Sequence, residues 1–222
     1  MEAMHRTPSG ETEIPHIRCV SDSAKVSRKI VIIKPNEAFA IIWIGWFLSW
    51  MTASFWSSRT EKRAATKETW IYRAAILTGG VLMTPWAAQV IGESRIWEVG
   101  NNVAYGLIVV TLLGLLLTWL ARIHLGRLWS SAITRKERHR LVDTGPYAFV
   151  RHPIYTGIIT ALVATAAIEA TLAALVGAAL ICFGLWLKAR AEERFLMVEL
   201  GPDDYKSYCR RVPMLIPFLW HR

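Results

Sequence analysis

The sequence predicts an all-α protein, a polytopic membrane helical bundle with about five transmembrane helices. Of its 222 residues, 53% are hydrophobic, which is more than ordinary soluble domains contain. Several apolar runs reach the length of about 20 residues that a hydrocarbon core requires. The last run, residues 153–187, is long enough to fold back on itself as a helical hairpin. These observations favour one integral membrane domain preceded by a polar tail.

The first elements follow from the alternation of polar and apolar segments. Residues 1–36 are polar and form an N-terminal tail. The first span covers residues 37–58, whose tryptophans favour membrane interfaces. The second span covers residues 70–91, and Pro85 predicts a kink there, which neighbouring helices can tolerate. The third span covers residues 99–120 and is rich in leucine and valine.

The last apolar run decides the predicted topology. Its 35 residues would form a straight helix of about 50 Å, whereas the hydrocarbon core is about 30 Å thick. The run also contains Glu169, and a lone carboxylate in mid-bilayer is costly. We therefore predict a hairpin with arms at 153–167 and 170–200 and with Glu169 at its turn. The second arm is expected to end at Gly201-Pro202, so residues 37–222 form one transmembrane domain.

The charge pattern predicts which side of the membrane each connection faces. The chain carries 26 basic and 17 acidic residues, an excess typical of cytoplasmic loops and of contact with anionic lipids. The basic residues are scattered over separate loops, which argues against nucleic-acid binding. Most of those in connections follow the first, third and fifth spans, so these connections are predicted to be cytoplasmic. The basic tail is discordant, and we expect it to be translocated nonetheless.

Cysteine usage and the N-terminus complete this general description. Cys19, Cys182 and Cys209 are widely separated and odd in number, which supports neither a disulfide framework nor a zinc site. We therefore expect no metal. No signal peptide is expected either, because the first apolar run begins only near Ala38.

Two polar clusters stand at the two ends of the predicted hairpin. Arg151 and His152, flanked by tyrosines, lie where its first helix begins, and residues 190–193 lie just past its apolar stretch. Each cluster alone has an ordinary explanation: an arginine that reaches the headgroups, or a Lys188–Glu192 pair four residues apart. The hairpin, however, returns the chain to the level at which it entered. The two clusters are therefore expected to face each other on one side of the bilayer.

Six short motifs occur in a fixed order in the last part of the chain, over about residues 100–220. They are Leu-Gly-Arg-Leu-Trp-Ser (125–130), Leu-Val-Asp-Thr-Gly-Pro-Tyr (141–147), Arg-His-Pro-Ile-Tyr-Thr-Gly (151–157), Glu-Glu-Arg-Phe-Leu (192–196), Gly-Pro-Asp-Asp-Tyr-Lys-Ser-Tyr (201–208) and Arg-Val-Pro-Met-Leu-Ile-Pro (211–217). In this order they resemble the isoprenylcysteine carboxyl methyltransferase and phospholipid methyltransferase family of integral membrane methyltransferases. The first hundred residues carry no matching motif.

The resemblance implies an S-adenosyl-L-methionine cofactor, bound in a C-terminal region at the cytoplasmic ends of the last helices. A Rossmann-type site is not indicated, because no Gly-x-Gly-x-x-Gly follows a strand. The segment from 205 to 217 resembles the family's C-terminal lid, although an amphipathic interfacial anchor is an alternative. The residues implied in cofactor binding are Gly145, Pro146, Tyr147, His152, Tyr155, Glu192, Glu193 and Tyr205, and those implied in cofactor or acceptor chemistry are Arg151, Arg190 and Glu193.

The expected reaction is methyl transfer to a lipophilic acceptor at the membrane surface, as in isoprenylcysteine carboxyl O-methylation. Such a displacement requires the protein mainly to orient the acceptor and to exclude water. A carboxylate acceptor needs no base, and an arginine can orient it. An amine acceptor must be neutral, so Glu193 or His152 would take its proton. Membrane lipids and a lipidated or other lipophilic acceptor are the expected partners.

Three alternatives remain open at the level of the sequence. One is phospholipid (ethanolamine) N-methylation within the same family. Another is an NADPH-dependent sterol-type membrane reductase, whose family also resembles the Arg-His-x-x-Tyr-x-Gly region but is not expected to show Glu192-Glu193 followed by Gly201 and Tyr205. The last is a membrane protein that keeps the fold without activity, against which the intact set of motifs argues.

Overall fold

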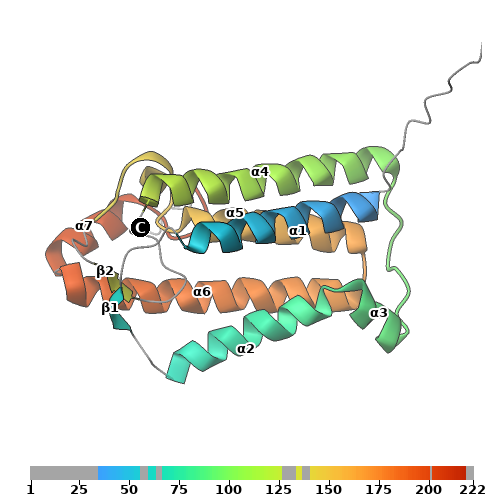
Figure 1. Ribbon diagram of the computed structural model, residues 1–222, viewed down its shortest axis with the longest axis horizontal. Coiled ribbons are helices and arrows are strands. Elements are labelled where there is room, and N and C mark those ends of the chain that lie inside the picture. Colours follow the sequence, from blue (N-terminus) through green and yellow to red (C-terminus); the bar gives the residue numbers. More distant parts are fainter. Residues whose placement is uncertain are drawn as a thin grey trace, which may run out of the picture. The chain divides into compact units, whose positions relative to one another are not determined.

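The described part of the chain is almost entirely helical (Figure 1), which confirms the predicted all-α class. The computed structural model describes residues 35–55, 60–63, 67–126, 134–136, 141–200 and 202–218. Nearly all of the predicted tail, residues 1–36, lies outside them. The helices are α1 (Pro35–Ser54), α2 (Lys67–Leu82), α3 (Pro85–Ile91), α4 (Asn101–Leu125), the 3₁₀ helix η2 (Gly145–Ala148), α5 (Pro153–Glu169), α6 (Leu172–Leu200) and α7 (Pro202–Arg211).

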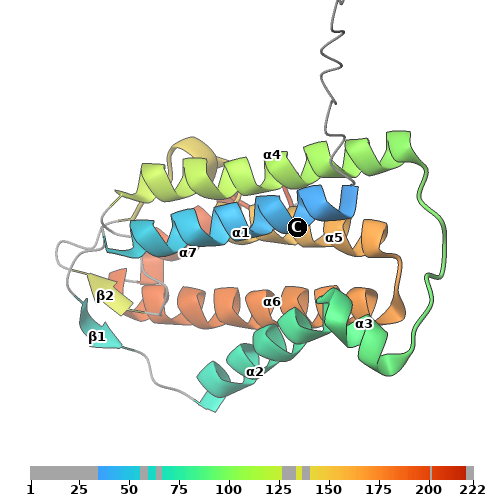
Figure 2. The ribbon, with the colours of Figure 1, turned by 45° about the vertical axis from the view of Figure 1, so that its right-hand side comes forward.

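The long helices pack in two layers that the last hairpin joins. Helix α4 packs along α5, with α1 beside both, whereas α2 packs along α6. Figures 1 and 2 show this arrangement from two directions. Contacts between α5 and α6 connect the layers. The largest buried cluster lies between them and includes Tyr155, Leu162, Ile181 and Leu185.

Pairs of glycines allow the helices of each layer to approach closely. A Cβ atom on Gly114 of α4 would lie 2.6 Å from the carbonyl oxygen of Gly157 in α5. A Cβ atom on Gly79 of α2 would lie 2.5 Å from the carbonyl oxygen of Gly177 in α6. Small residues at helix crossings are the usual means of close packing in membranes. These two crossings therefore fix the spacing of α4 with α5 and of α2 with α6.

Helix α1 is attached to the first layer by tryptophan side chains. The indole Nε1 of Trp43 donates a hydrogen bond of 3.0 Å to Thr165 Oγ1 in α5, and that of Trp46 donates one of 2.9 Å to Thr118 Oγ1 in α4. In an apolar environment such side-chain bonds supply polar groups with partners that lipid cannot offer. The tryptophans therefore orient α1 as well as filling space.

The predicted hairpin and its turn are confirmed. Helix α5 ends at Glu169, Ala170 adopts a left-handed conformation with φ of 54°, and α6 begins at Leu172. The hydroxyl of Thr171 accepts a hydrogen bond from the Ala174 amide at 3.2 Å, so it caps the new helix. The first arm is two residues longer than predicted. At the other end, α6 stops at Leu200 and α7 begins at Pro202, as predicted from Gly201-Pro202.

The second predicted span is broken at the expected place. Helices α2 and α3 meet at an angle of 75°, with Pro85 as the first residue of α3 and the Thr84 hydroxyl accepting a hydrogen bond from the Ala87 amide. The kink predicted from Pro85 is therefore confirmed. Proline causes it because its ring removes a backbone donor and displaces the preceding turn.

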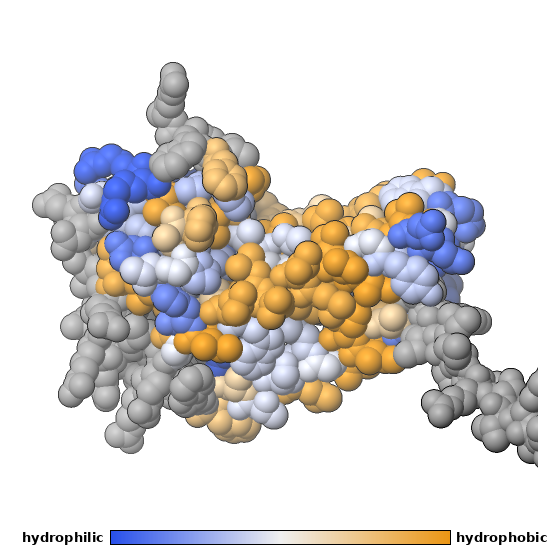
Figure 3. Space-filling model, turned by 90° about the horizontal axis from the view of Figure 1, so that it is seen from above, coloured by the Kyte–Doolittle hydropathy of each residue, from blue (hydrophilic) through white to orange (hydrophobic). Residues whose placement is uncertain are grey.

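Two helical segments of the described chain are long and apolar enough to cross a membrane, 101–125 and 172–198, and the bent α2–α3 pair would be a third. Residues 37–53 and 153–169 form shorter apolar helices. Apolar side chains dominate the middle of the face in Figure 3, and polar ones gather toward its ends. The bundle is thus suited to a bilayer, and the count of five spans stays a prediction.

A short antiparallel ribbon of strands β1 (Thr60–Arg63) and β2 (Thr134–Lys136) was not predicted. It pairs the connection after α1 with the connection after α4. Both are among those expected on the cytoplasmic side. Their pairing requires them to lie on one side of the bundle, as the predicted topology demands.

The Gly114–Gly157 crossing gives a test of the packing. In Gly157→Ala the new methyl group would fall on the Gly114 carbonyl and on Thr118, and such overpacking typically costs about 1–3 kcal/mol. We expect a clear loss of thermal stability of the purified protein, followed by its tryptophan fluorescence. Gly106→Ala in α4 is the control, because nothing lies within 4 Å of its added Cβ. Equal stabilities of the two variants would contradict the close crossing.

Candidate functional site

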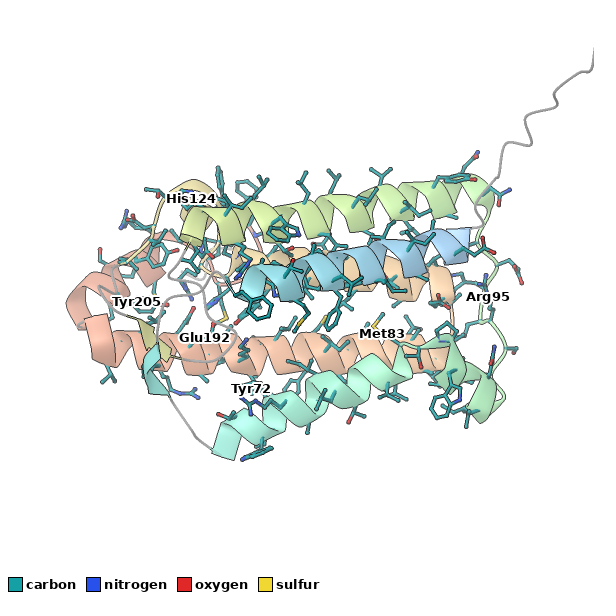
Figure 4. The ribbon with its side chains drawn as sticks, viewed as in Figure 1. Tyr72, Met83, Arg95, His124, Glu192 and Tyr205 are labelled. Carbon is teal, nitrogen blue, oxygen red and sulfur yellow. The ribbon has the colours of Figure 1, made fainter. Side chains whose placement is uncertain are left out.

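The N-terminal end of α5, the C-terminal half of α6, the turn η2 and helix α7 meet at one end of the bundle. Figure 4 shows His124, Glu192 and Tyr205 at this end and Arg95 at the other. Helix α5 begins here at Pro153, which suits a first helical position because no amide bond is lost there. His152 precedes it without capping the helix by its side chain. Its imidazole is instead turned toward α6.

Glu193 of α6 is held by two residues of the segment before α5. Arg151 Nε donates a hydrogen bond of 2.7 Å to Glu193 Oε1, and His152 Nε2 lies 3.2 Å from the same oxygen. Glu193 and His152 are only 7% and 9% exposed. Bonds to ionised groups in such a buried setting are strong. Burial lowers the pKa of Arg151, but the hydrogen bond and charge of Glu193 outweigh it, and the pKa of the guanidinium is raised.

Glu192, the next residue, faces the same end of α5. Tyr155 Oη donates a hydrogen bond of 2.7 Å to Glu192 Oε1, and His152 Nδ1 lies 3.6 Å from Oε2. The His152 and Tyr155 rings are stacked, with their planes 4° apart. Lys188 lies one turn earlier, with Nζ 3.9 Å from Glu192 Oε1. The imidazole therefore stands between two carboxylates, and the two clusters recognised in the sequence meet.

The turn η2 forms a second wall of this end of the bundle. Gly145 has a φ of 57°, and a Cβ on it would lie 2.7 Å from Cε1 of His124. Pro146 occupies the first turn of η2, and Tyr147 is buried. Burial raises the pKa of Tyr147, so its phenol stays protonated. Glycine is required here for conformation and for space.

Helix α7 contributes two buried tyrosines. Tyr205 and Tyr208 are 2% and 3% exposed, and burial raises the pKa of both. Tyr208 Oη donates a hydrogen bond of 2.7 Å to the Tyr147 carbonyl. Tyr205 lies against Tyr208, and it is close enough to Glu193 and Arg151 to interact with their charges. Helix α7 therefore connects η2 to the Glu193 network.

His124 is a residue of this region that the sequence analysis did not single out. Its Nε2 lies 2.9 Å from Thr144 Oγ1, and its ring stacks on Tyr147. It fills the space that a side chain at position 145 would need. The available signal was its position just past the predicted end of the third span at residue 120, directly before the Leu125-Gly126 motif.

Arg190 is the predicted site residue that the structure does not bring into this network. Its side chain is exposed, and its guanidinium lies 5.0 Å from the centre of the Trp186 ring. Trp186 and Arg190 are four residues apart, which places them on the same face of α6. Its expected part in acceptor chemistry stays a prediction.

The comparisons with known proteins agree with the resemblance. Residues 107–198 match the model of the isoprenylcysteine carboxyl methyltransferase (ICMT) family, so the predicted resemblance is confirmed over most of α4, over η2 and α5, and over most of α6. The structure of the eukaryotic intramembrane Ras methyltransferase ICMT is similar in fold, with a TM-score of 0.54 and 17% identity over 86% of this chain and 71% of that one.

Three curated relatives show the range of similar sequences. The cobalt-zinc-cadmium resistance protein CzcN of Cupriavidus metallidurans is 32% identical over 60% of this chain and 58% of its own. The protein-S-isoprenylcysteine O-methyltransferase B of Arabidopsis thaliana is 28% identical over 58% and 64%. The methanethiol S-methyltransferase 1 of Bradyrhizobium diazoefficiens is 43% identical over 34% and 25%. The chain thus spans less than two thirds of the length of each of these relatives.

The packing of His124 against Gly145 gives a second test. Gly145→Ala adds a methyl group in a left-handed conformation and against the His124 ring. We expect it to lose about 1–3 kcal/mol more stability than Gly92→Ala. Gly92 has a φ of 73°, and nothing lies within 4 Å of an added Cβ, so Gly92→Ala should lose stability only through backbone strain. Thermal unfolding of the purified variants measures both.

A double variant separates overlap from conformational strain. In His124→Ala/Gly145→Ala the ring is gone, so the added methyl group should cost no more than it does at Gly92. A Gly145→Ala penalty of the same size with or without the His124 ring would contradict the contact.

Proposed function

We propose that this chain, whose residues 107–198 match the isoprenylcysteine carboxyl methyltransferase family, is an integral membrane enzyme that transfers a methyl group from S-adenosyl-L-methionine to a lipophilic acceptor. The observation that carries the proposal is the pair of adjacent carboxylates, Glu192 and Glu193, held at the start of α5 by Tyr155, His152 and Arg151. All five residues lie within the matched segment.

The chemistry of these residues fits the cofactor. S-adenosyl-L-methionine carries a sulfonium and an ammonium cation and two ribose hydroxyls. Two carboxylates offer counter-charges and acceptors for these groups, and Tyr155 and His152 hold the carboxylates in place. The turn at Gly145, Pro146 and Tyr147, together with Tyr205, would complete the enclosure. When bound, the cofactor supplies an activated methyl group and a neutral leaving group.

The contacts of Glu193 favour a carboxylate acceptor over an amine. Its Oε1 already faces both Arg151 and His152, and a carboxylate stabilised by two such donors is a weak base. A carboxylate acceptor requires no proton transfer, so this arrangement does not hinder its methylation. An amine acceptor needs a base. We therefore place isoprenylcysteine-like carboxyl O-methylation first and phospholipid N-methylation second.

The protein's own task is to orient the reactants and keep water out. The phenols of Tyr205 and Tyr208 are buried near Glu193 and keep water from that side of it. The apolar cluster of Ile154, Tyr155 and Leu185 continues from the carboxylates into the bundle. A lipophilic acceptor would therefore meet the cofactor at the membrane surface. We place this end on the cytoplasmic side, because the basic connections are expected there.

The first experiment is calorimetric binding of S-adenosylhomocysteine to the detergent-purified protein, with NADPH titrated in parallel. Saturable binding of S-adenosylhomocysteine alone is expected. Binding of NADPH alone would mean that the reductase alternative is right, and binding of neither by folded protein would refute the proposal. Transfer of radiolabelled methyl groups to a prenylcysteine carboxylate, to phosphatidylethanolamine and to a small thiol would then identify the acceptor class.

The carboxylate pair gives a third test. Glu193→Gln keeps the shape of the side chain but removes the charge that faces Arg151 and His152. We expect normal expression and a loss of S-adenosylhomocysteine affinity of about 100-fold. Glu169→Gln is the control, because Glu169 lies at the far hairpin turn, and its binding and activity should stay near normal. Unchanged binding in Glu193→Gln would remove Glu193 from the site.

A further inference from the structure

Arg151 joins three parts of the chain that are distant in sequence. Its Nε donates to Glu193 on α6, while its Nη1 donates to the carbonyl oxygens of Cys209, at 3.0 Å, and of Val212. Residues 202–218, which we call the C-terminal cap, comprise α7 and the segment after it. The Arg151 side chain therefore spans from α6 to the end of α7.

The backbone around Arg151 binds the same cap. The Arg151 amide donates a hydrogen bond of 2.9 Å to the Pro213 carbonyl, and the His152 amide donates one of 3.1 Å to the Met214 carbonyl. The Thr156 hydroxyl donates one of 2.6 Å to the Leu215 carbonyl. The cap is thus bound to the start of α5 through its own main chain.

The position of the guanidinium on α7 has a physical reason. The last carbonyls of a helix lack partners within it, and they form the negative end of the helix dipole. Helix α7 ends at Arg211, so Cys209 contributes one of these carbonyls, and Val212 follows directly. A buried arginine satisfies both and supplies the favoured charge. Arg151 therefore satisfies the last carbonyls of α7, although it belongs to another part of the chain.

An ion pair between the cap and the body is exposed and weak. Arg211 Nη2 lies 3.6 Å from Asp143 Oδ2, and the two side chains are 63% and 40% exposed. Exposed pairs of this kind contribute little. The side chains of Arg151 and Glu193 are, in contrast, only 10% and 9% exposed. The Arg151 guanidinium, held by buried Glu193, therefore makes stronger hydrogen bonds to the Cys209 and Val212 carbonyls of the cap than the exposed Arg211–Asp143 pair provides.

We propose that Arg151 is a positioning residue that latches the C-terminal cap to Glu193 and so assembles the cofactor site, rather than a residue that contacts the acceptor. This inference rests on the proposed function. Arg151 Nε serves Glu193 and Nη1 serves the cap, so closure of the cap and orientation of the carboxylate occur together. Loss of the Arg151 side chain is therefore expected to loosen the cap and the Glu193 carboxylate together.

Hydrogen–deuterium exchange of the full chain in lipid nanodiscs, without ligand, tests the latch. In Arg151→Gln we expect the amides of 205–215 to exchange about 100-fold faster, because breaking a buried pair is strongly destabilising. Arg151→Lys should give exchange rates between those of Arg151→Gln and the unmodified protein, since an ammonium keeps the charge but cannot bind Glu193 and the cap carbonyls in a fixed geometry. Arg211→Gln is the matched control in the same helix and should exchange as the unmodified protein does.

Binding and kinetics separate positioning from acceptor contact. In the Arg151 variants S-adenosylhomocysteine affinity should fall by about the same factor as cap protection, while the KM for acceptor at saturating cofactor stays unchanged. Unchanged exchange and cofactor affinity, with a raised KM for acceptor, would overturn the proposal. If Arg151→Gln does not fold, Arg151→Lys decides in the same way. Because the exchange experiment needs no ligand, failure of the unmodified protein to bind S-adenosylhomocysteine would refute the proposed function separately.

Discussion

The structure depends on the burial of Glu193 together with its two donors. Removing a carboxylate from water is expensive unless charge and hydrogen bonds compensate for it. Arg151 and His152 provide both from a segment 42 and 41 residues away in sequence, respectively. Arg151 and His152 can reach Glu193 only if α5 and α6 form a hairpin, so that the start of α5 lies beside the C-terminal half of α6. The turn at Ala170 and the glycine crossings of the two layers set this arrangement, so the helix packing and the site depend on each other.

The features that the sequence predicted are those set by length and by local chemistry. A run of 35 apolar residues interrupted by Glu169 predicts a turn, because neither feature suits a single crossing. Pro85 predicts a kink for a similarly local reason. The meeting of the two polar clusters then follows from the hairpin geometry alone. The sequence therefore indicates which residues bind one another across α5 and α6.

The features that the sequence did not predict involve main chain or packing between distant segments. No pattern of side-chain types in the sequence indicates the β1–β2 ribbon, the hydrogen bonds to the Pro213 and Met214 carbonyls, or the contact of His124 with Gly145. The position of Arg190 outside the network could, in contrast, have been predicted from the helical periodicity of α6. Ile181, Leu185 and Ala189 are buried at intervals of four, and Glu193 continues that face, whereas Trp186 and Arg190 lie on an exposed one.

The proposed latch joins the segment that matches the family model to the C-terminal cap. The segment that matches the family model ends at 198, before the cap begins. Yet the cap is attached to it mainly through carbonyl oxygens, which every residue type carries. A side-chain hydrogen bond to a main-chain carbonyl requires a particular residue type only in the donor. Here the donor is Arg151. These contacts therefore constrain where α7 ends, because Arg151 must reach its last carbonyls.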